Sequence, residues 1–363
     1  IGASTVNARW FTSAPALIVS GASVQVSVTD TGSDVSSGAK EKVETSPVRS
    51  ASAIPEPVDL AVLAVPKDQV ADAVEDCGRK GVKALVVISA GFAEVGPAGR
   101  ALQDDVLRRA RRFGMRLVGP NCLGLVNTDP EVQLDATFAP VWPPAGNVAF
   151  SSQSGALGVA ILDHARSLGI GIRHFISVGN KADVSGNDLL EYWEHDPDTR
   201  VILFYLESLG RPGRFMEIAR RVARRKPIVV VKSGRTESGA RAASSHTGSL
   251  AGLDVAVDAL FGQAGVIRTD TIEELFDLAL LLANQPVPAG DRVAILTNAG
   301  GPGIMASDAC ESHGLRVAQL APETAQGLAA FLLAEASLSN PVDMLADARP
   351  AFYERALQLV LAD

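Results

Sequence analysis

The run Asp59-Leu60-Ala61-Val62-Leu63-Ala64-Val65 decides the fold class, because it is almost wholly apolar and stops at Pro66. A strand that is buried on both faces has such a continuous apolar sequence, whereas a half-exposed strand alternates apolar and polar residues. Helix-like sequence follows from Gln69 to Arg79, and the next strand-like run is Ala84 to Ser89. A strand, a helix and a second strand in this order predict a parallel sheet wound with helices.

The same alternation continues along the chain and predicts three α/β domains. Two proline-rich stretches, Trp142–Gly146 and Gln285–Pro288, are typical of joints between domains. We therefore expect domains at residues 1–143, 144–287 and 288–363. The last is expected to be cut short, because no helix stop signal precedes Asp363. Its final segment should be a helix with one apolar face, made of Tyr353, Leu357, Val360 and Leu361. Strands are expected, among others, at 116–120, 147–150, 172–178, 200–206, 227–231 and 292–296.

The first fifty residues fit the alternation least well. Ile1-Gly2-Ala3-Ser4 is compatible with the end of a first strand and the start of a phosphate-binding turn, but no G-x-G-x-x-G spacing follows. The stretch from Thr31 to Ser52 is rich in serine, glycine and charge. It is compatible with a mobile loop and with a divergent strand–helix unit, and the sequence leaves both open.

Composition excludes several classes of protein. The 33 basic and 41 acidic residues give a net charge of −8, so no global basic field attracts nucleic acid or an acidic membrane. No apolar run reaches the length of a membrane span, and the N-terminus lacks a secretory pattern. Cys77, Cys122 and Cys310 are far apart, which fits a reducing cytoplasm. No Cys/His cluster has the spacing of metal ligands, so no metal site is expected.

The segment Ser244-Ser245-His246-Thr247-Gly248-Ser249-Leu250 carries one of only five histidines. Its neighbours are small and flexible, so the imidazole has room to swing and to carry a bulky group. A loop histidine that is hydrogen-bonded to the backbone would have the same local sequence. The segment alone does not separate these two interpretations.

Two further stretches favour the chemical interpretation. Ser151-Ser152-Gln153-Ser154-Gly155 and Asn298-Ala299-Gly300-Gly301-Pro302-Gly303 each indicate a glycine-containing turn between a strand and a helix. Backbone N–H groups and the helix dipole favour an anion at such a turn, although a single instance is also compatible with ordinary chain reversal. A nucleophilic imidazole and two anion-binding helix starts together indicate a phosphohistidine. The expected phosphate-binding residues are Ser152, Ser154, Gly155, Gly300 and Gly301.

Four motifs occur in the order in which NDP-forming acyl-CoA synthetases carry them. They are Gly119-Pro120-Asn121-Cys122-Leu123-Gly124, Ser152-Gln153-Ser154-Gly155, Ser245-His246-Thr247-Gly248 and Asn298-Ala299-Gly300-Gly301, and Asn340-Pro341-Val342-Asp343 also looks like a family segment. The chain resembles this family, which includes succinyl-CoA synthetase and ADP-forming acetate–CoA ligases, from about Ala53 to Asp363. Before Ala53 the resemblance rests on Ile1-Gly2-Ala3-Ser4 alone.

The resemblance implies a Rossmann-like CoA-binding domain followed by flavodoxin-like parallel-sheet domains. Coenzyme A would lie beyond the carboxyl ends of strands in the first domain, where open α/β sheets bind their ligands. Asn121 and Cys122 would lie near the pantetheine thiol, although Cys122 is equally compatible with a small buried apolar residue. The implied CoA-binding residues are Gly2, Ser4, Val65, Pro66, Ser89, Gly91, Asn121 and Cys122.

By the same resemblance His246 matches the family's phosphorylated histidine, and Glu207 matches the carboxylate that orients it. A carboxylate on one ring nitrogen fixes the tautomer and leaves the other nitrogen free to attack phosphorus. A solvated acid at a strand end is the alternative interpretation of Glu207.

The implied activity is that of an acid–thiol ligase, which converts an acid, CoA and ATP to acyl-CoA, ADP and phosphate through a phosphohistidine. The nucleotide step, with ATP or ADP and Mg, requires an ATP-grasp subunit or domain that this sequence does not contain, and an oligomer is expected. Two other classes remain open. One is the CoA- or acyl-CoA-sensing regulatory unit of a larger lysine N-acetyltransferase, although a pure sensor has no need of a phosphorylatable histidine. The other is a Rossmann oxidoreductase, against which the missing G-x-G-x-x-G argues.

Overall fold

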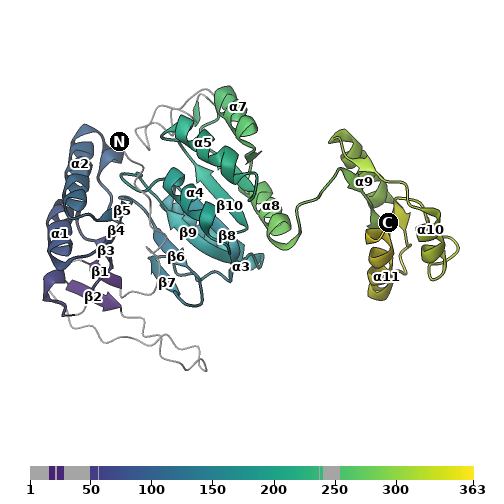
Figure 1. The fold of residues 1–363 in the computed structure, drawn as a ribbon, viewed down its shortest axis with the longest axis horizontal. Coiled ribbons are helices and arrows are strands. Elements are labelled where there is room, and N and C mark those ends of the chain that lie inside the picture. Colours follow the sequence, from purple (N-terminus) through teal and green to yellow (C-terminus); the bar gives the residue numbers. More distant parts are fainter. Residues whose placement is uncertain (1–15, 21–22, 28–49, 56, 237, 240–253) are drawn as a thin grey trace. The chain divides into compact units, whose positions relative to one another are not determined.

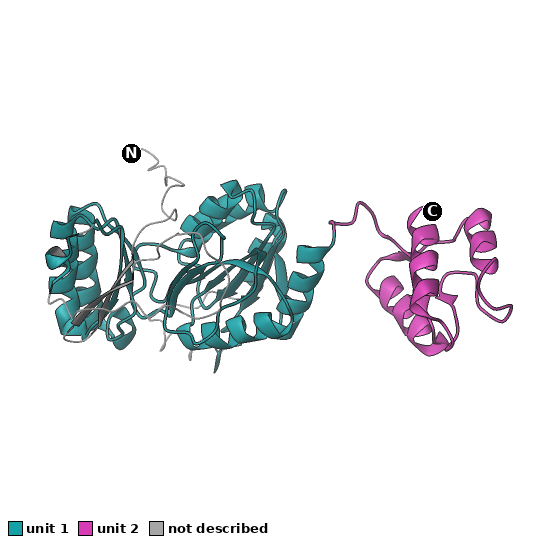
Figure 2. Cartoon of the chain, turned by 90° about the horizontal axis from the view of Figure 1, so that it is seen from below, with its two compact units in different colours: residues 1–285 teal, residues 286–363 magenta. Residues whose placement is uncertain are grey.

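The computed structural model describes residues 16–20, 23–27, 50–55, 57–236, 238–239 and 254–363. The chain forms two compact units, residues 1–285 and 286–363, which are coloured separately in Figure 2. Both units are built from strands and helices in alternation, so the predicted α/β class is confirmed. Among the described residues, no helix combines the length and apolar character needed to cross a bilayer.

The first sheet of the larger unit has the strand order β2-β1-β3-β4-β5. Its strands are β1 (Ala16–Ser20), β2 (Ser23–Ser27), β3 (Leu60–Ala64), β4 (Ala84–Val87) and β5 (Arg116–Val118). The pairs are parallel except for β1 with β2. Helices α1 (Lys67–Lys80) and α2 (Pro97–Arg112), with short 3-10 turns at Ala51–Ala53 and Ala93–Val95, connect the strands, and α1 and α2 lie on one side of the sheet (Figure 1).

The two faces of this sheet have different partners, which explains the continuous apolar run at Asp59–Val65. Ala61 and Leu63 belong to a core that includes Val74 of α1 and Val106 of α2. The alternating residue Val62 belongs instead to a core shared with the second sheet. A strand with both faces covered has no position left for a polar side chain.

The second sheet has the strand order β12-β11-β10-β8-β9-β6-β7, in which β6 pairs antiparallel with both β7 and β9. Its strands are β6 (Gly124–Asn127), β7 (Leu134–Thr137), β8 (Ala145–Ser152), β9 (Ile172–Ser177), β10 (Val201–Leu206), β11 (Ile228–Lys232) and β12 (Ile267–Thr269). The helices around it are α3 (Gly155–Ser167), α4 (Gly186–His195), α5 (Pro212–Val222), α7 (Asp254–Ala264) and α8 (Ile272–Asn284).

Alternate residues of the central strands again enter different cores. In β10, Ile202 and Phe204 pack in the core of α4, α5 and α7. Val201 and Leu203 pack in the core of α3 and α8 on the other face. Parallel strands between two helical layers thus present their carboxyl ends at one edge of the sheet, where ligands of such folds bind.

The smaller unit contains two two-stranded parallel sheets, β13 (Arg292–Val293) with β15 (Arg316–Val317) and β14 (Leu296–Thr297) with β16 (Val342–Asp343). Its helices are α9 (Gly300–Ser312), α10 (Pro322–Ala329) and α11 (Pro350–Leu361). Leu328, Leu332, Val342, Met344 and Ala356 form its buried core.

Two local expectations for the smaller unit need correction. The single strand expected at 292–296 is split, because the side chain of Asn340 bonds between its halves. Asn340 Oδ1 accepts from Ile295 N at 2.8 Å, and Asn340 Nδ2 donates to Val293 O at 2.8 Å. The final helix forms as expected, but Leu357 and Leu361 of its predicted apolar face are exposed.

The predicted division at residue 143 remains a prediction, although the sheets themselves change over earlier in the chain. Strands β6 and β7 precede residue 143 and hydrogen-bond within the second sheet. The first sheet ends with β5 at Val118, so the loop from Gly119 to Leu123 links the two sheets.

Candidate functional site

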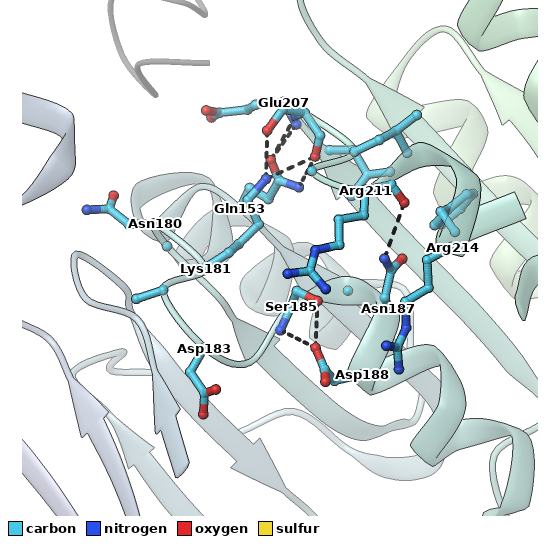
Figure 3. Close-up of a pocket in the computed structure, with 18 of the residues that line it drawn as sticks. Gln153, Asn180, Lys181, Asp183, Ser185, Asn187, Asp188, Glu207, Arg211 and Arg214 are labelled. Atoms are coloured by element: carbon cyan, nitrogen blue, oxygen red, sulfur yellow. Dashed lines mark hydrogen bonds between the residues drawn. The ribbon is translucent and has the colours of Figure 1, made fainter. Parts of the chain in front are cut away.

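A pocket of about 820 Å³ opens at the carboxyl ends of β8, β9 and β10 (Figure 3). Residues from the first sheet and its helices, such as Arg100, Arg111 and Arg116, also line it. The pocket wall is largely polar and includes Asn121, Gln153, Asn180, Lys181, Asp183, Ser185, Asn187, Asp188, Glu207, Ser208, Arg211 and Arg214.

The turn from β8 into α3 is shaped by two serine hydroxyl groups. Ser152 Oγ accepts from Ser154 N at 3.2 Å and donates to Ser154 O at 2.8 Å. Ser154 is the N-cap of α3, and its hydroxyl accepts from Leu157 N at 3.3 Å. A serine at this position satisfies one of the orphan donors of the first helical turn. The remaining N–H groups and the helix dipole favour an anion at this turn.

Gln153 connects this turn to the end of β10. Its Oε1 accepts from both Glu207 N and Ser208 N at 2.9 Å, and its Nε2 donates to Ser208 O at 2.7 Å. Figure 3 shows these bonds converging from the two strand ends. The amide therefore fixes the backbone from which the Glu207 carboxylate projects.

Lys181 reaches the same strand end from the loop after β9. Its Nζ donates to Ser208 Oγ at 2.6 Å and to Ser208 O at 3.0 Å. Burial lowers the pKa of Lys181 to about 8, against the opposing effect of the Glu207 carboxylate and with a further lowering by the Lys232 ammonium. Lys181 was not among the predicted site residues. The signal available was its place just after the strand-like run 172–178, whereas Glu207, also at a strand end, was predicted from the family resemblance.

Close backbone packing joins the loop of Lys181 to the loop of Asn121. Asn180 N donates to Pro120 O at 3.0 Å, and Ala182 N donates to Gly119 O at 3.0 Å. Gly179 has a φ of +50°, and a Cβ on it would lie 2.3 Å from Asn121 O, so no larger residue fits. The Asn180 amide donates to Gln103 Oε1 of α2 at 3.0 Å, which ties this loop to the first sheet's helices.

Carboxylates pair with three of the arginines that line the pocket. Asp183 accepts from Arg116 at 2.7 Å and from Arg111 at 3.2 Å, and Arg214 pairs with Glu191 at 2.9 Å. Arg211 extends into the pocket (Figure 3). It forms no ion pair with any carboxylate in the described part of the chain.

The implied CoA-binding residues of the described chain follow the carboxyl ends of β3, β4 and β5, and hydrogen bonds link three of them. Ser89 Oγ donates to Val65 O, and Asn121 N donates to Ser89 O at 2.9 Å. Pro66 is the N-cap of α1, and Gly91 N donates to Glu94 Oε1 at 2.6 Å.

Cys122 is buried, and its thiol donates to Val87 O at 3.3 Å. Burial raises the pKa of Cys122 to about 12, so the group stays a thiol at neutral pH. Among its two predicted interpretations, these properties favour the small buried apolar residue, and contact with CoA remains a prediction.

Gly300 and Gly301 begin α9 in the smaller unit, and both are exposed. Ala299 N donates to Thr297 Oγ1 at 3.1 Å, and Thr297 Oγ1 donates to Ala299 O at 2.9 Å. An ideal Cβ on Gly300 would lie 3.3 Å from Asp343 Oδ2, so a carboxylate stands beside this helix start.

Three predicted site residues, Gly2, Ser4 and His246, lie outside the described residues. Ser152, Ser154, Gly155 and Glu207 come together at one edge of the second sheet, as the strand pattern predicts. Within the described ranges, no group of three or more His, Cys, Asp or Glu side chains is placed to hold a metal ion.

Family models match the chain in three consecutive segments. A CoA binding domain matches residues 34–128, a succinyl-CoA ligase-like flavodoxin domain matches 145–282, and a Ligase-CoA domain matches 293–363. The fold and these matches define an α/β protein of the CoA-ligase class.

Individual relatives narrow the class. The chain is 50% identical over 310 residues to an ADP-forming acetate–CoA ligase of Archaeoglobus fulgidus, covering 85% of this chain and 45% of that protein. It is 45% identical to the alpha subunit of the ADP-forming acetate–CoA ligase II of Pyrococcus furiosus, covering 87% of this chain and 68% of that subunit. The chain belongs to the NDP-forming acyl-CoA synthetase family, together with the ADP-forming acetate–CoA ligases. It spans a little under half the length of the first of these relatives and of a similar ligase of Methanocaldococcus jannaschii.

Solved structures agree with this assignment. A dinucleotide-forming acetyl-coenzyme A synthetase of Ca. Korarchaeum cryptofilum, in complex with phosphate and ADP, superposes with a TM-score of 0.83 at 41% identity. The match covers 90% of this chain and 70% of that one.

Proposed function

We propose that this chain is the CoA-binding and phosphohistidine part of an NDP-forming acyl-CoA synthetase. The complete enzyme would convert a carboxylic acid, CoA and ATP to acyl-CoA, ADP and phosphate. The observation that carries the proposal is that Gln153 of the β8–α3 turn and Glu207 at the end of β10 line one pocket and are joined by a hydrogen bond. The names of the relatives, which are acetate–CoA ligases, support the same reaction.

In the proposed reaction, a ring nitrogen of His246 attacks the terminal phosphorus of ATP, and ADP leaves. The acid's carboxylate then takes the phosphoryl group, which gives an acyl phosphate and restores the imidazole. Finally the CoA thiol attacks the acyl carbonyl, and phosphate leaves with the thiol's proton. Each step is reversible, so acyl-CoA and phosphate can also phosphorylate His246.

The described residues would orient His246 and bind the anionic groups that take part in these reaction steps. Glu207 would accept a hydrogen bond from one ring nitrogen of His246 and so orient the other toward phosphorus. The N–H groups at the start of α3, after Ser154, would hold the phosphoryl oxygens through fixed dipoles. Gly300 and Gly301 at the start of α9 would do the same at a second turn. Coenzyme A would bind beyond β3, β4 and β5, at Val65, Ser89 and Asn121.

The nucleotide step would use an ATP-grasp subunit or domain that holds ATP or ADP with Mg. One relative is itself named as an alpha subunit, which supports a partner chain and an oligomeric assembly. The proposed location is the cytoplasm, where ATP and CoA are available. The sensing unit of a lysine acetyltransferase, expected as the alternative, gains no support from these relatives, which are named as ligases.

The reverse half-reaction tests the proposal with this chain alone. Incubation with acetyl-CoA and radiolabelled inorganic phosphate should label the protein at His246. The label should be lost in acid and retained in base, because phosphohistidine is acid-labile. His246→Ala should abolish labelling, and His313→Ala, which removes an exposed histidine of α9's C-terminus, should leave it unchanged. Persistent labelling of the His246→Ala protein would contradict the assigned nucleophile.

A further inference from the structure

Lys181 combines three properties that the proposed function has not used. It lines the pocket, it is largely buried, and it has a φ of +56°. A non-glycine residue in this left-handed region costs of the order of 1–2 kcal/mol and persists only where its surroundings hold it. Here Lys181 N donates to Val178 O at 2.9 Å, and Nζ holds both oxygens of Ser208.

The two bonds to Ser208 use two of the three donors of an ammonium group. The residue next to Ser208 is Glu207, whose charge acts on Lys181. The ammonium therefore lies at the same strand end as the proposed orienting carboxylate, in a pocket that would receive a phosphoryl group. Arg116 and Arg214 of the same pocket are paired with Asp183 and Glu191. Arg211 enters the pocket from the start of α5, whereas Lys181 is hydrogen-bonded to the Glu207–Ser208 strand end itself.

We propose that Lys181 is a positioning residue of the phosphoryl-transfer site, which fixes the Glu207–Ser208 strand end and presents its remaining N–H to the phosphoryl oxygens. This inference rests on the proposed function and adds a residue to it. Fixed N–H dipoles at a helix start carry no net charge, whereas the phosphoryl group carries a formal negative charge throughout its transfer. Lys181 would supply the balancing charge.

The charged groups around Lys181 bear on how it titrates. Glu207 follows β10, and Lys232 ends β11. On the pocket wall, Arg116 forms ion pairs with both Asp183 and Asp188. Arg211, the residue before α5, also lines the pocket. Because its pKa is lowered to about 8, Lys181 is charged at neutral pH and loses its charge as pH rises above 8. Transfer that needs this charge should therefore decline on the alkaline side.

Lys226 is a matched control for Lys181. Its Nζ also donates to two oxygens, here the backbone carbonyls Trp193 O and Asp196 O, each at 2.5 Å. Burial lowers the pKa of Lys226 as well. Lys226 does not line the pocket. A purely structural effect of removing an ammonium that is bonded to two protein oxygens should therefore appear in Lys226→Met as well as in Lys181→Met.

The experiment measures labelling of His246 from acetyl-CoA and labelled phosphate, between pH 6.5 and 9.5, as a function of phosphate concentration. For Lys181→Met we expect a rate lower by about 10- to 100-fold, a higher apparent KM for phosphate and no alkaline decline. Lys181→Arg should restore much of the rate and extend it to pH 9.5, because arginine stays protonated. Lys226→Met should keep the wild-type pH profile and phosphate KM. Phosphate and CoA change protonation with pH in the same way in every variant's assay, so this change does not affect the comparison between variants.

The outcomes separate the two proposals. If the wild-type protein is labelled and Lys181→Met has the wild-type phosphate KM and the wild-type alkaline decline, the role of Lys181 is overturned. The proposed function is then unaffected. A wild-type protein that is never labelled would contradict the proposed function. Calorimetric titration with inorganic phosphate then still tests Lys181, because weaker binding to Lys181→Met than to Lys226→Met is expected and equal binding would overturn the inference. Lys181→Arg serves the same comparison if the Met variant does not fold.

Discussion

The turn from β8 into α3 and the turn from β14 into α9 share a pair of hydrogen bonds and have different surroundings. In each, the hydroxyl of the strand's last residue, Ser152 or Thr297, accepts from the N–H and donates to the carbonyl of the residue two positions later. In each, the helix begins at a glycine, Gly155 or Gly300. The two similar sequence motifs thus produce one backbone geometry twice.

The surroundings decide what each turn can bind. Beside the first, Gln153 holds the backbone of Glu207, and Lys181 brings a cation to the same strand end. Beside the second, Asp343 places a carboxylate next to Gly300, and its Oδ1 accepts from Leu345 N at 3.0 Å. A carboxylate at a helix start occupies the place that an anionic ligand would take. We infer that the first turn is the better phosphoryl site within the described chain.

The largest expected difference between the turns is in the labelling rate when the residue after the strand's last residue is replaced, which is Gln153 in the first turn and Asn298 in the second. Gln153→Ala removes three hydrogen bonds that position Glu207 and Ser208, and we expect His246 labelling to slow by about 100-fold. Asn298→Ala, at the equivalent exposed position of the second turn, should change the rate by less than about threefold. Equal losses in the two variants would show that the turns contribute equally.

The two carboxylates provide the next test. Glu207→Gln should slow labelling by about 10-fold, because an amide can still hydrogen-bond but does not balance a developing imidazolium charge. In Asp343→Asn the amide oxygen can still accept from Leu345 N, so labelling should stay within about threefold of the wild-type rate. A loss in Asp343→Asn as large as in Glu207→Gln would reverse the ranking of the two turns. Both rates come from the same acetyl-CoA and phosphate assay.

Removal of the turn hydroxyls should affect stability more in the first turn. Ser152 is fully buried, and Ser152→Ala leaves Ser154 N and O without this partner, at a cost of about 2 kcal/mol. Thr297→Val is a nearly isosteric change at a residue with 9% of its surface exposed, and it should cost about 1 kcal/mol. Shifts in the midpoint of urea unfolding measure both, and a larger shift for Thr297→Val would contradict the expected order.

The smallest expected effect is on stability, where replacing a glycine by alanine should have opposite effects in the two turns. A Cβ on Gly155 would lie 3.2 Å from Leu123 N, so Gly155→Ala should destabilise the protein by about 1 kcal/mol. Nothing lies within 4 Å of a Cβ on Gly301, so Gly301→Ala should stabilise α9 by about 0.5 kcal/mol, because alanine has the higher helix propensity. Thermal unfolding of the two variants should shift in opposite directions, and a shared direction would refute the packing difference.

Strand ends were the most predictable part of the site. The apolar runs before Ser89, Ser152 and Glu207 predict parallel strands, and the carboxyl ends of such strands meet at one edge. Gln153 belonged to a recognised motif, but its contact with Glu207 joins residues 54 positions apart in the chain. Local sequence cannot show such a partner.

Lys181 and Asn340 show the limit of local patterns more sharply. Lys181 donates to Ser208, 27 positions away, and Asn340 breaks the strand expected at 292–296 through a bond to Ile295, 45 positions away. Lys181 was marked only by its place after a strand-like run, and Asn340 only by the family segment that it begins. Neither pattern shows which distant residue the side chain bonds.

The sequence by itself determined the α/β class, the alternation of strands and helices, the two glycine turns and the family, because apolar periodicity and turn chemistry are properties of neighbouring residues. Only the tertiary structure decided that one turn faces an amide and a lysine while the other faces a carboxylate. It also decided that the pKa of Lys181 falls to about 8. Burial and charge depend on which distant residues the fold brings within a few ångströms, and the electrostatic cost of a buried ammonium exists only once they surround it.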